Sequence, residues 1–140
     1  MTNTNTWRHQ DPLQLSEDEW LTLLKDPTII DEAGRKMLAF VYHQPNHQSS
    51  ATEIGEALGG VSQQQVTAWN RRIAKRVYKR LGKEPPLNMN GGYRYWNALF
   101  DGEPEGILNN KGYFIWRLRP AVVAALKRSG IVEQYPPSSQ

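Results

Sequence analysis

Apolar residues recur every three or four positions through the first 81 residues, the spacing of amphipathic helices. The pattern predicts four helices, at about residues 17–25, 31–43, 51–58 and 62–81. The polar stretch at 46–49 is expected to be a loop. Three of the helices begin with the serine and the Glu or Gln of a capping box. These pairs are Ser16 with Glu19, Ser50 with Glu53, and Ser62 with Gln65.

The pattern changes after residue 82. Residues 93–100 and 113–118 are rich in aromatic side chains and partly alternate with polar ones, which predicts the two strands of a β-hairpin. The loop between them is full of turn-forming residues. Pro120 fits the first position of a last helix at residues 121–129. The expected fold class is α+β: mostly helical, with a C-terminal β-hairpin and a final helix.

A chain of 140 residues is long enough for one domain with one core. We expect that domain at residues 13–133, after a flexible N-terminal tail at residues 1–12. Residues 134–140 contain two prolines and two serines, which is typical of a C-terminal tail or linker. If they form a linker, the chain is expected to be a module that continues into a further domain.

The amino-acid composition excludes several kinds of functional site and indicates where the protein is located. The chain has no cysteine, which excludes disulfides, thiolate metal sites and cysteine nucleophiles. No apolar run approaches the roughly 18–20 residues of a membrane helix. The polar first ten residues do not resemble a signal peptide. We therefore expect a cytoplasmic protein.

The net charge of +3 is unevenly distributed. Residues 1–61 carry a net charge of −5 and residues 96–140 a net charge of +1. Residues 62–95 contain eight Lys or Arg and one acidic residue, a net charge of +7. Such segregated positive charge is expected of a protein that binds nucleic acid. Charge alone leaves a solvated basic helix face as the alternative.

Residues 52–73 are typical of a helix–turn–helix. Gly55 allows the two helices to approach closely, Gly59 supplies the turn, and Ser62 caps the second helix. An extra glycine, Gly60, departs from the commonest spacing of the motif. Two ordinary packed helices joined by a glycine turn remain the alternative.

The second helix of this motif has two different faces. The residues expected to face the core are Val66, Trp69, Ile73 and Val77. The opposite face carries amides and hydroxyls first and cations later, which suits a helix whose N-terminus enters a DNA major groove. Gln63 and Gln64 are candidates to read adenine, and Arg71 to contact guanine or a phosphate. The other cations of this helix are expected to contact phosphates. The predicted DNA-binding residues are Ser62, Gln63, Gln64, Thr67, Arg71, Arg72, Lys75, Arg76 and Lys79.

The hairpin would form a wing beside this helix. Its cations that are expected to approach the DNA backbone are Arg94, Lys111, Arg117 and Arg119. Acidic residues at the loop tip, Asp101, Glu103 and Glu105, count against the tip as a minor-groove probe. The candidates to stack on an unpaired or flipped base are Tyr93, Tyr95, Trp96 and Trp116. Core packing is nevertheless the favoured interpretation for most of the hairpin's aromatic residues.

Residues 69–73 (WNRRI), 95–97 (YWN), 113–120 (YFIWRLRP) and the last helix are the most distinctive stretches. Over about residues 30–132, the chain resembles N-terminal winged-helix modules of bacterial restriction-type proteins. These proteins include HNH nucleases and ATPases of modification-dependent systems. The resemblance implies a module of a restriction or defence system that recognises DNA, including modified DNA, for a downstream nuclease or ATPase domain.

The sequence offers little for catalysis. His43 and His47 are four positions apart, but Pro45 lies between them and no third ligand is near, which favours ordinary loop histidines. The acids at 101, 103 and 105 are expected to be plain loop residues rather than Mg²⁺ ligands. There is no phosphate-binding loop, dinucleotide fingerprint or nucleophile elbow. We expect no enzyme, no metal and no cofactor.

The sequence thus predicts a winged helix–turn–helix that binds double-stranded DNA with a major-groove helix and a β-hairpin wing. The alternative is a protein-binding adaptor or a phage-type inhibitor on the same scaffold. In that case the acidic N-terminal half would mimic DNA or dock a basic partner. The candidate acids for this role are Glu17, Asp18, Glu19, Asp31, Glu32, Glu53 and Glu56.

Overall fold

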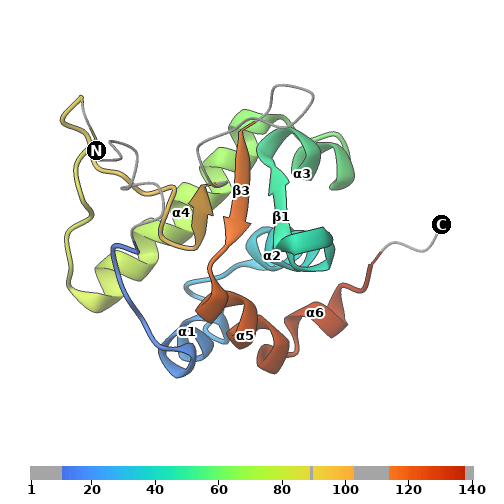
Figure 1. Ribbon diagram of the computed structural model, residues 1–140, viewed down its shortest axis with the longest axis horizontal. Helices are drawn as coiled ribbons and strands as arrows, with labels where there is room; N and C mark the ends of the chain where they lie inside the picture. Colours follow the sequence, from blue (N-terminus) through green and yellow to red (C-terminus); the bar gives the residue numbers. More distant parts are fainter. Residues whose placement is uncertain (1–10, 89, 103–113, 138–140) are drawn as a thin grey trace, which may run out of the picture.

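The computed structural model describes residues 11–88, 90–102 and 114–137, which form helices and three short strands (Figure 1). Most of the expected N-terminal tail, the acids at 103 and 105, Lys111 and the last three residues lie outside these ranges. In chain order the elements are α1 (Glu17–Leu24), α2 (Glu32–His43), a 3₁₀ turn η2 (Pro45–His47), β1 (Gln48–Ser50), α3 (Ala51–Ala57), α4 (Gln63–Leu81), β2 (Phe100–Gly102), β3 (Ile115–Leu118), α5 (Pro120–Ser129) and α6 (Ile131–Gln134).

The expected helices are confirmed, and local capping explains where they begin and end. Ser16 and Ser50 each form a reciprocal capping box, and Ser62 Oγ accepts a hydrogen bond from the Gln65 amide (3.2 Å). Gly82 ends α4 with φ at 66°, a left-handed conformation that glycine adopts without steric cost. The fold is α+β, as expected, and the short α6 is a helix that the pattern did not predict.

The strand predictions need two corrections. The expected strand at 93–100 is wrong over most of its length, because residues 96–99 form a turn and β2 begins at Phe100. Residues 97–100 are buried consecutively, so tertiary packing replaces the alternation of a strand there. The expected loop at 46–49 is also partly wrong, because Gln48 and Ser49 belong to β1. The backbone of β1 pairs with a partner more than 60 residues away, which no local pattern reveals.

The three strands form an antiparallel sheet in the order β1–β3–β2. Trp116 of the central strand lies opposite Ser49 on one side and Gly102 on the other. In Figure 1, α1, α5 and α6 lie at one end of the molecule and α3 at the other, with β1 and β3 between them. The sheet therefore ties the α3–α4 pair to the remaining helices.

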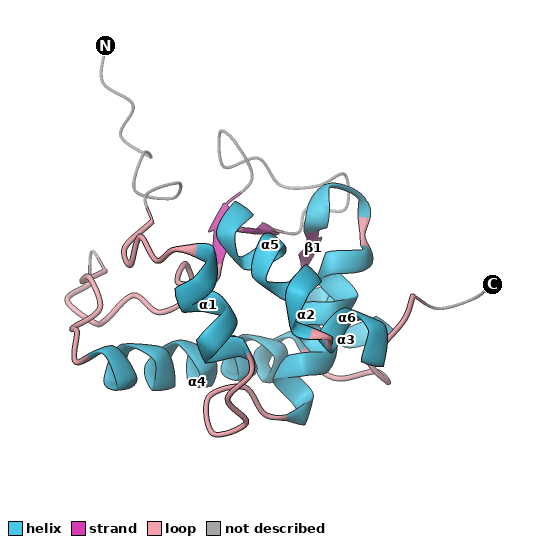
Figure 2. Ribbon diagram, turned by 90° about the horizontal axis from the view of Figure 1, so that it is seen from below, coloured by secondary structure: helices cyan, strands magenta, loops and turns pink. Residues whose placement is uncertain are grey.

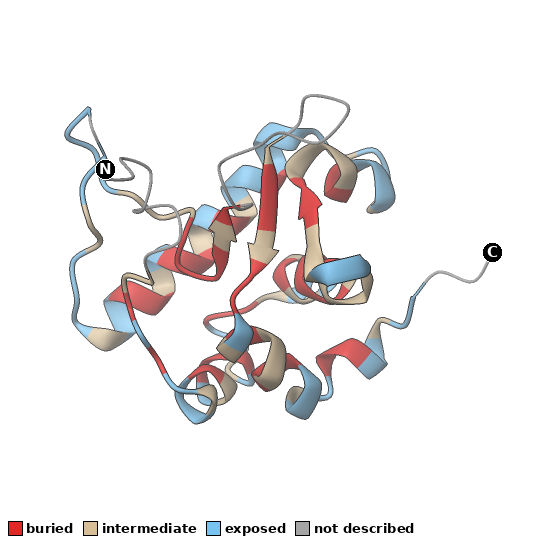
Figure 3. Cartoon of the chain, in the orientation of Figure 1, coloured by how far each residue is buried: buried red, intermediate tan, exposed pale blue. Residues whose placement is uncertain are grey.

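One hydrophobic core joins all the layers. Met37 and Leu38 of α2 are fully buried at its centre, where α2 packs against α4 and α6. Trp20 of α1 and Leu126 of α5 are buried where these two helices meet. Figure 3 shows the buried stretches on α2 and β3 and on one side of α4. Within the described residues, no helix is both long and apolar enough to cross a membrane.

The close approach of α3 and α4 depends on a glycine, as the sequence predicts. A Cβ atom at Gly55 would collide with the carbonyl oxygen of Val61. The turn between the helices passes through Gly59 and Gly60, whose φ angles are 101° and 80°. The amides of Gly60 and Val61 both donate to the Gly55 carbonyl (3.0 and 2.9 Å). The extra glycine is thus part of the turn that fixes where α4 begins.

Replacing Gly55 with alanine is expected to destabilise the protein. The methyl group would strike backbone that cannot move without disrupting the turn, a form of overpacking that typically costs about 1–3 kcal/mol in the free energy of unfolding. Chemical denaturation followed by circular dichroism measures the change. Gly92→Ala is the matched control, because its Cβ would meet Asn90 Oδ1 at an ordinary 3.5 Å. Equal denaturation midpoints for Gly55→Ala and the wild type would contradict the conclusion that the close approach of α3 and α4 requires a glycine at this position.

Candidate nucleic-acid interface

Helix α4 runs along one side of the molecule and has one buried and one exposed face (Figure 2). Val66, Ile73 and Val77 are buried, as predicted, whereas Trp69 is half-buried. Asn70 is also fully buried, although its amide is polar. The buried side therefore includes a polar residue that apolar periodicity does not identify.

The outer face of α4 presents amides, a hydroxyl and cations to solvent. The predicted residues that are exposed are Ser62, Gln63, Gln64, Thr67, Arg71, Lys75 and Lys79. Gln63 is partly engaged, because its Oε1 accepts a hydrogen bond from the Thr52 hydroxyl of α3 (3.1 Å). Among the described residues, none of the three cations Arg71, Lys75 and Lys79 has an ion pair. This face can therefore offer hydrogen-bond donors and positive charge to a ligand.

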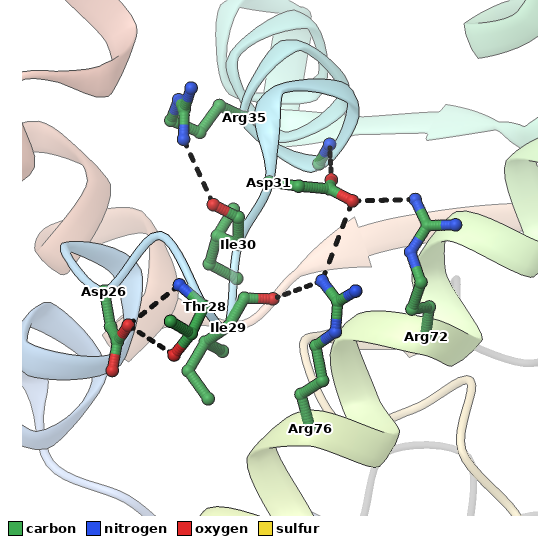
Figure 4. Close-up of polar contacts among 9 residues, drawn as sticks. Asp26, Thr28, Ile29, Ile30, Asp31, Arg35, Arg72 and Arg76 are labelled. Carbon is green, nitrogen blue, oxygen red and sulfur yellow. Dashed lines mark hydrogen bonds and ion pairs between the residues drawn. The ribbon is translucent and has the colours of Figure 1, made fainter.

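The other three cations of α4 form a separate stripe on the flank that faces the α1–α2 connection. Arg72 Nη2 lies 2.9 Å and Arg76 Nη1 3.6 Å from Asp31 Oδ2. Arg76 also donates to the carbonyl of Ile29 (3.4 Å), and Figure 4 shows both guanidinium groups pointing toward this connection. Arg80 Nη2 lies 2.7 Å from an oxygen of Asp26. Arg72 and Arg76 are thus half-buried and paired, rather than wholly free for phosphate as the sequence predicts.

The two aspartates on this flank are held in their charged forms. Hydrogen bonds from the Thr28 hydroxyl and amide, with a contribution from Arg80, lower the pKa of Asp26 to about 2. Partial burial of Asp31 raises its pKa, but the Gly34 amide and the two arginines outweigh that effect, and its pKa lies below the usual value. Both carboxylates are therefore ionised at neutral pH, opposite the arginines of α4.

Tyr95 lies under the two cations on the opposite flank of α4. The guanidinium carbon of Arg71 is 5.8 Å and Lys75 Nζ 5.6 Å from the centre of its ring, within the range of cation–π attraction. A hollow of about 560 Å³ lies here, between α4 and the segment that follows it. Its lining includes Thr67, Asn88 and Trp96. Cations, amides and aromatic rings thus converge beside the exposed face.

Buried polar contacts fix the position of this aromatic segment. The Asn70 amide donates to the carbonyl of Trp96 (3.0 Å). Arg119 donates to the carbonyl of Asn97 through Nε and Nη2 (3.1 and 2.9 Å). Arg119 is 4 % exposed, so the expectation that it approaches DNA is wrong. Its guanidinium instead holds the turn that replaces the expected strand.

The remaining cations of the expected wing have different positions. Arg94 and Arg117 are half-buried. Arg94 donates to the carbonyl of Leu87 (2.8 Å), and Arg117 of β3 donates to Gln48 of β1 (3.0 Å). Lys111 lies outside the described residues. In the described residues of the expected wing, both arginines are therefore partly engaged.

The four candidates for base stacking also differ. Trp116 is 7 % exposed and packs on Phe100 with ring centres 5.1 Å apart, so the structure contradicts a stacking role for it. The ring of Tyr95 is already in contact with two cations. Trp96 is half-buried and packs edge-on against Phe114. Tyr93 is 46 % exposed and remains the most accessible ring of the four.

The histidines and acids considered for metal binding make local contacts. His43 Nε2 lies within hydrogen-bond distance of the carbonyls of Val132 and Tyr135 (3.2 and 3.1 Å), which links α2 to α6. His47 Nδ1 contacts the carbonyl of Tyr42 (2.6 Å). Asp101 lies in β2, opposite Arg117. In the part of the chain that the structure describes, no three metal-ligating side chains come together.

Some members of this site could be recognised only in part from sequence. The spacing of Arg72, Arg76 and Arg80 places them on one stripe of a helix. This spacing indicates that they contact the same part of the protein or ligand, but it does not identify that part. In the sequence, Asp26 and Asp31 are simply two of the acidic residues in the N-terminal half. Only folding brings them next to that stripe. No sequence signal indicates that Tyr95 lies beneath Arg71 and Lys75, because that contact depends on the path of residues 82–95.

No protein-family model, curated protein or solved structure matches this chain. The chemistry of the site therefore has to be inferred from its geometry. Exposed amides at the start of α4 can hydrogen-bond to polar edges, and the cations further along can bind anions. A ligand that carries both polar edges and regularly spaced negative charge would match both features.

The low pKa of Asp26 predicts an acid-dependent loss of stability. Its contribution is fully present above the pKa of about 4 in the unfolded chain and is lost as the pH falls toward the folded value of about 2. Asp26→Asn should therefore show a shallower decline in unfolding free energy between pH 4 and 2, measured by denaturant titration at several pH values. Parallel pH profiles of unfolding free energy for Asp26→Asn and the wild type would contradict the low pKa assigned to Asp26.

Proposed function

We propose that this protein binds double-stranded DNA, with the exposed face of α4 in the major groove. One observation carries the proposal: Gln64, Arg71 and Lys75 share an exposed helical face. In that arrangement the amides at the start of α4 read base edges, and Arg71, Lys75 and Lys79 contact guanine or the phosphate backbone. Affinity then comes largely from counterion release.

The arrangement of elements supports a winged helix–turn–helix as the scaffold. Helix α3 packs against α4 through a glycine turn, and a β-ribbon follows α4 in the chain. The third strand, β1, lies directly before α3 and pairs with the ribbon. In this proposal β2 and β3 are the described strands of the wing. Arg94 and Arg117 are half-buried and would have to exchange their present hydrogen bonds for contacts with a DNA backbone.

The resemblance to modules of restriction-type proteins extends the proposal. A reader of this kind would select DNA, including DNA with a modified base, for a downstream nuclease or ATPase domain of a defence system. Exposed Tyr93 beside the hollow at α4 is the side chain best placed to contact such a base. The module itself then acts as a binding domain and not as an enzyme.

The adaptor or inhibitor alternative is less favoured, because many of the acids that it needs are engaged within the protein. Arg128 Nη1 lies 2.7 Å from both Glu17 and Asp18. The carboxylates of Glu19 and Glu53 accept hydrogen bonds in capping boxes, and Asp31 pairs with α4. Asp18, Glu19, Glu32 and Glu56 are exposed, but of these only Glu32 and Glu56 make no such contact within the described residues. An acidic DNA mimic would need more carboxylates that are free to face a partner.

The double variant Arg71→Ala/Lys75→Ala is expected to lower affinity for duplex DNA at least about tenfold, because it removes two phosphate or base contacts from the exposed face. Fluorescence anisotropy with a labelled duplex at fixed salt measures the change. The matched control is Lys25→Ala/Lys127→Ala, which removes two exposed cations outside α4 and should bind within about twofold of the wild type. Unchanged DNA binding by Arg71→Ala/Lys75→Ala would contradict the proposal.

Tyr95→Leu should weaken DNA binding severalfold, because it removes the aromatic face that holds Arg71 and Lys75 in place, an attraction of about 0.5–1 kcal/mol at exposed sites. Tyr95→Phe keeps the ring and should bind like the wild type. Anisotropy titrations of both variants provide the test, with thermal unfolding as a check on folding. Equal losses for the two variants would instead implicate the hydroxyl group.

A further inference from the structure

The paired arginines of α4 border the same surface as the free cations. Arg72 and Arg76 line a hollow of about 620 Å³ together with Gln64, Arg71 and Lys75. Their side chains are 39 % and 35 % exposed. A phosphate placed along the exposed face of α4 would therefore lie within reach of these two arginines, which are at present bound to Asp31.

Asp31 is held in place by its own helix, and its two oxygens have separate partners. Its Oδ1 accepts the Gly34 amide (2.9 Å) and so caps the N-terminus of α2. Its Oδ2 faces Arg72 at 2.9 Å and Arg76 at 3.6 Å. One oxygen of Asp31 thus caps α2, and the other contacts the arginines of α4. The negative charge of this second oxygen faces two guanidinium groups (Figure 4).

We infer that Asp31 acts as an internal substitute for a DNA phosphate and lowers the affinity of the exposed α4 face for DNA. This inference rests on the proposed function. Carboxylate and phosphate oxygens both accept charge-assisted hydrogen bonds from arginine. DNA must therefore either compete with Asp31 for Arg72 and Arg76 or bind without them.

A second carboxylate–arginine pair supplies a matched comparison. Asp26 pairs with Arg80 at 2.7 Å, but Arg80 does not line the hollow that contains Arg71 and Lys75. Both aspartates accept a backbone amide, from Thr28 or from Gly34, and asparagine can retain such a bond. The variants Asp31→Asn and Asp26→Asn therefore remove the same charge from two comparable pairs, of which one borders the proposed interface.

The test is a salt titration of duplex DNA binding for the wild type, Asp31→Asn and Asp26→Asn. Asp31→Asn should bind at least about threefold more tightly. Its plot of log K against log salt should be steeper by about 1–2, since each released arginine adds roughly 0.9 per phosphate contact. Asp26→Asn should stay within about twofold of the wild type and keep its slope. In the background Arg72→Ala/Arg76→Ala, the gain from Asp31→Asn should disappear.

Three outcomes would overturn the inference. Unchanged affinity and slope in Asp31→Asn would show that DNA does not use the two arginines, and weaker binding would show that Asp31 orients them. Equal gains in both aspartate variants would assign the effect to overall charge. If the wild type binds DNA through Arg71 and Lys75, these results overturn the inference alone. If neither the wild type nor Asp31→Asn binds duplex DNA, the proposed function falls with it.

Discussion

Helix α4 has to contribute one face to the hydrophobic core while it carries six cations and no acid in 19 residues. Like charges spaced along one helix repel each other, and arginine and lysine are costly to bury without partners. The fold meets this constraint with two different flanks. On one side the α1–α2 connection supplies carboxylates and a backbone carbonyl. On the other, the segment after α4 supplies the ring of Tyr95. Val66, Ile73 and Val77 can then be buried between them.

This division also separates two kinds of positive charge. Arginines 72, 76 and 80 are largely neutralised by partners that hold the α1–α2 connection against α4. Arg71 and Lys75 keep their charge, because an aromatic ring attracts a cation without neutralising it. The net positive charge of residues 62–95 is therefore exposed on a smaller surface than the sequence suggests. That surface lies beside the start of α4, where uncharged amides are exposed.

Local chemistry accounts for the parts of the fold that sequence predicts well. The helix starts at Ser16, Ser50 and Ser62 depend on hydrogen bonds across three residues, and the end of α4 depends on the backbone freedom of Gly82. Gly55 is also identifiable, because a glycine inside a short helix that is followed by a tight glycine turn indicates close approach of the next segment. The second half is less predictable. The aromatic alternation at 93–99 resembles a strand, but a buried arginine from residue 119 holds this segment as a turn.

The sequence by itself determined the helices, their caps, the glycine turn and the concentration of cations on α4, because each depends on neighbours within a few positions. The tertiary structure alone decided the pairing of β1 with β3, the burial of Trp116 and Arg119, and the partner of each cation. Most of these features join residues that are far apart in the sequence, such as Asp31 with Arg72 (41 positions) or Gln48 with Arg117 (69 positions). Such contacts form only when the whole core packs, and no local pattern of residues specifies them.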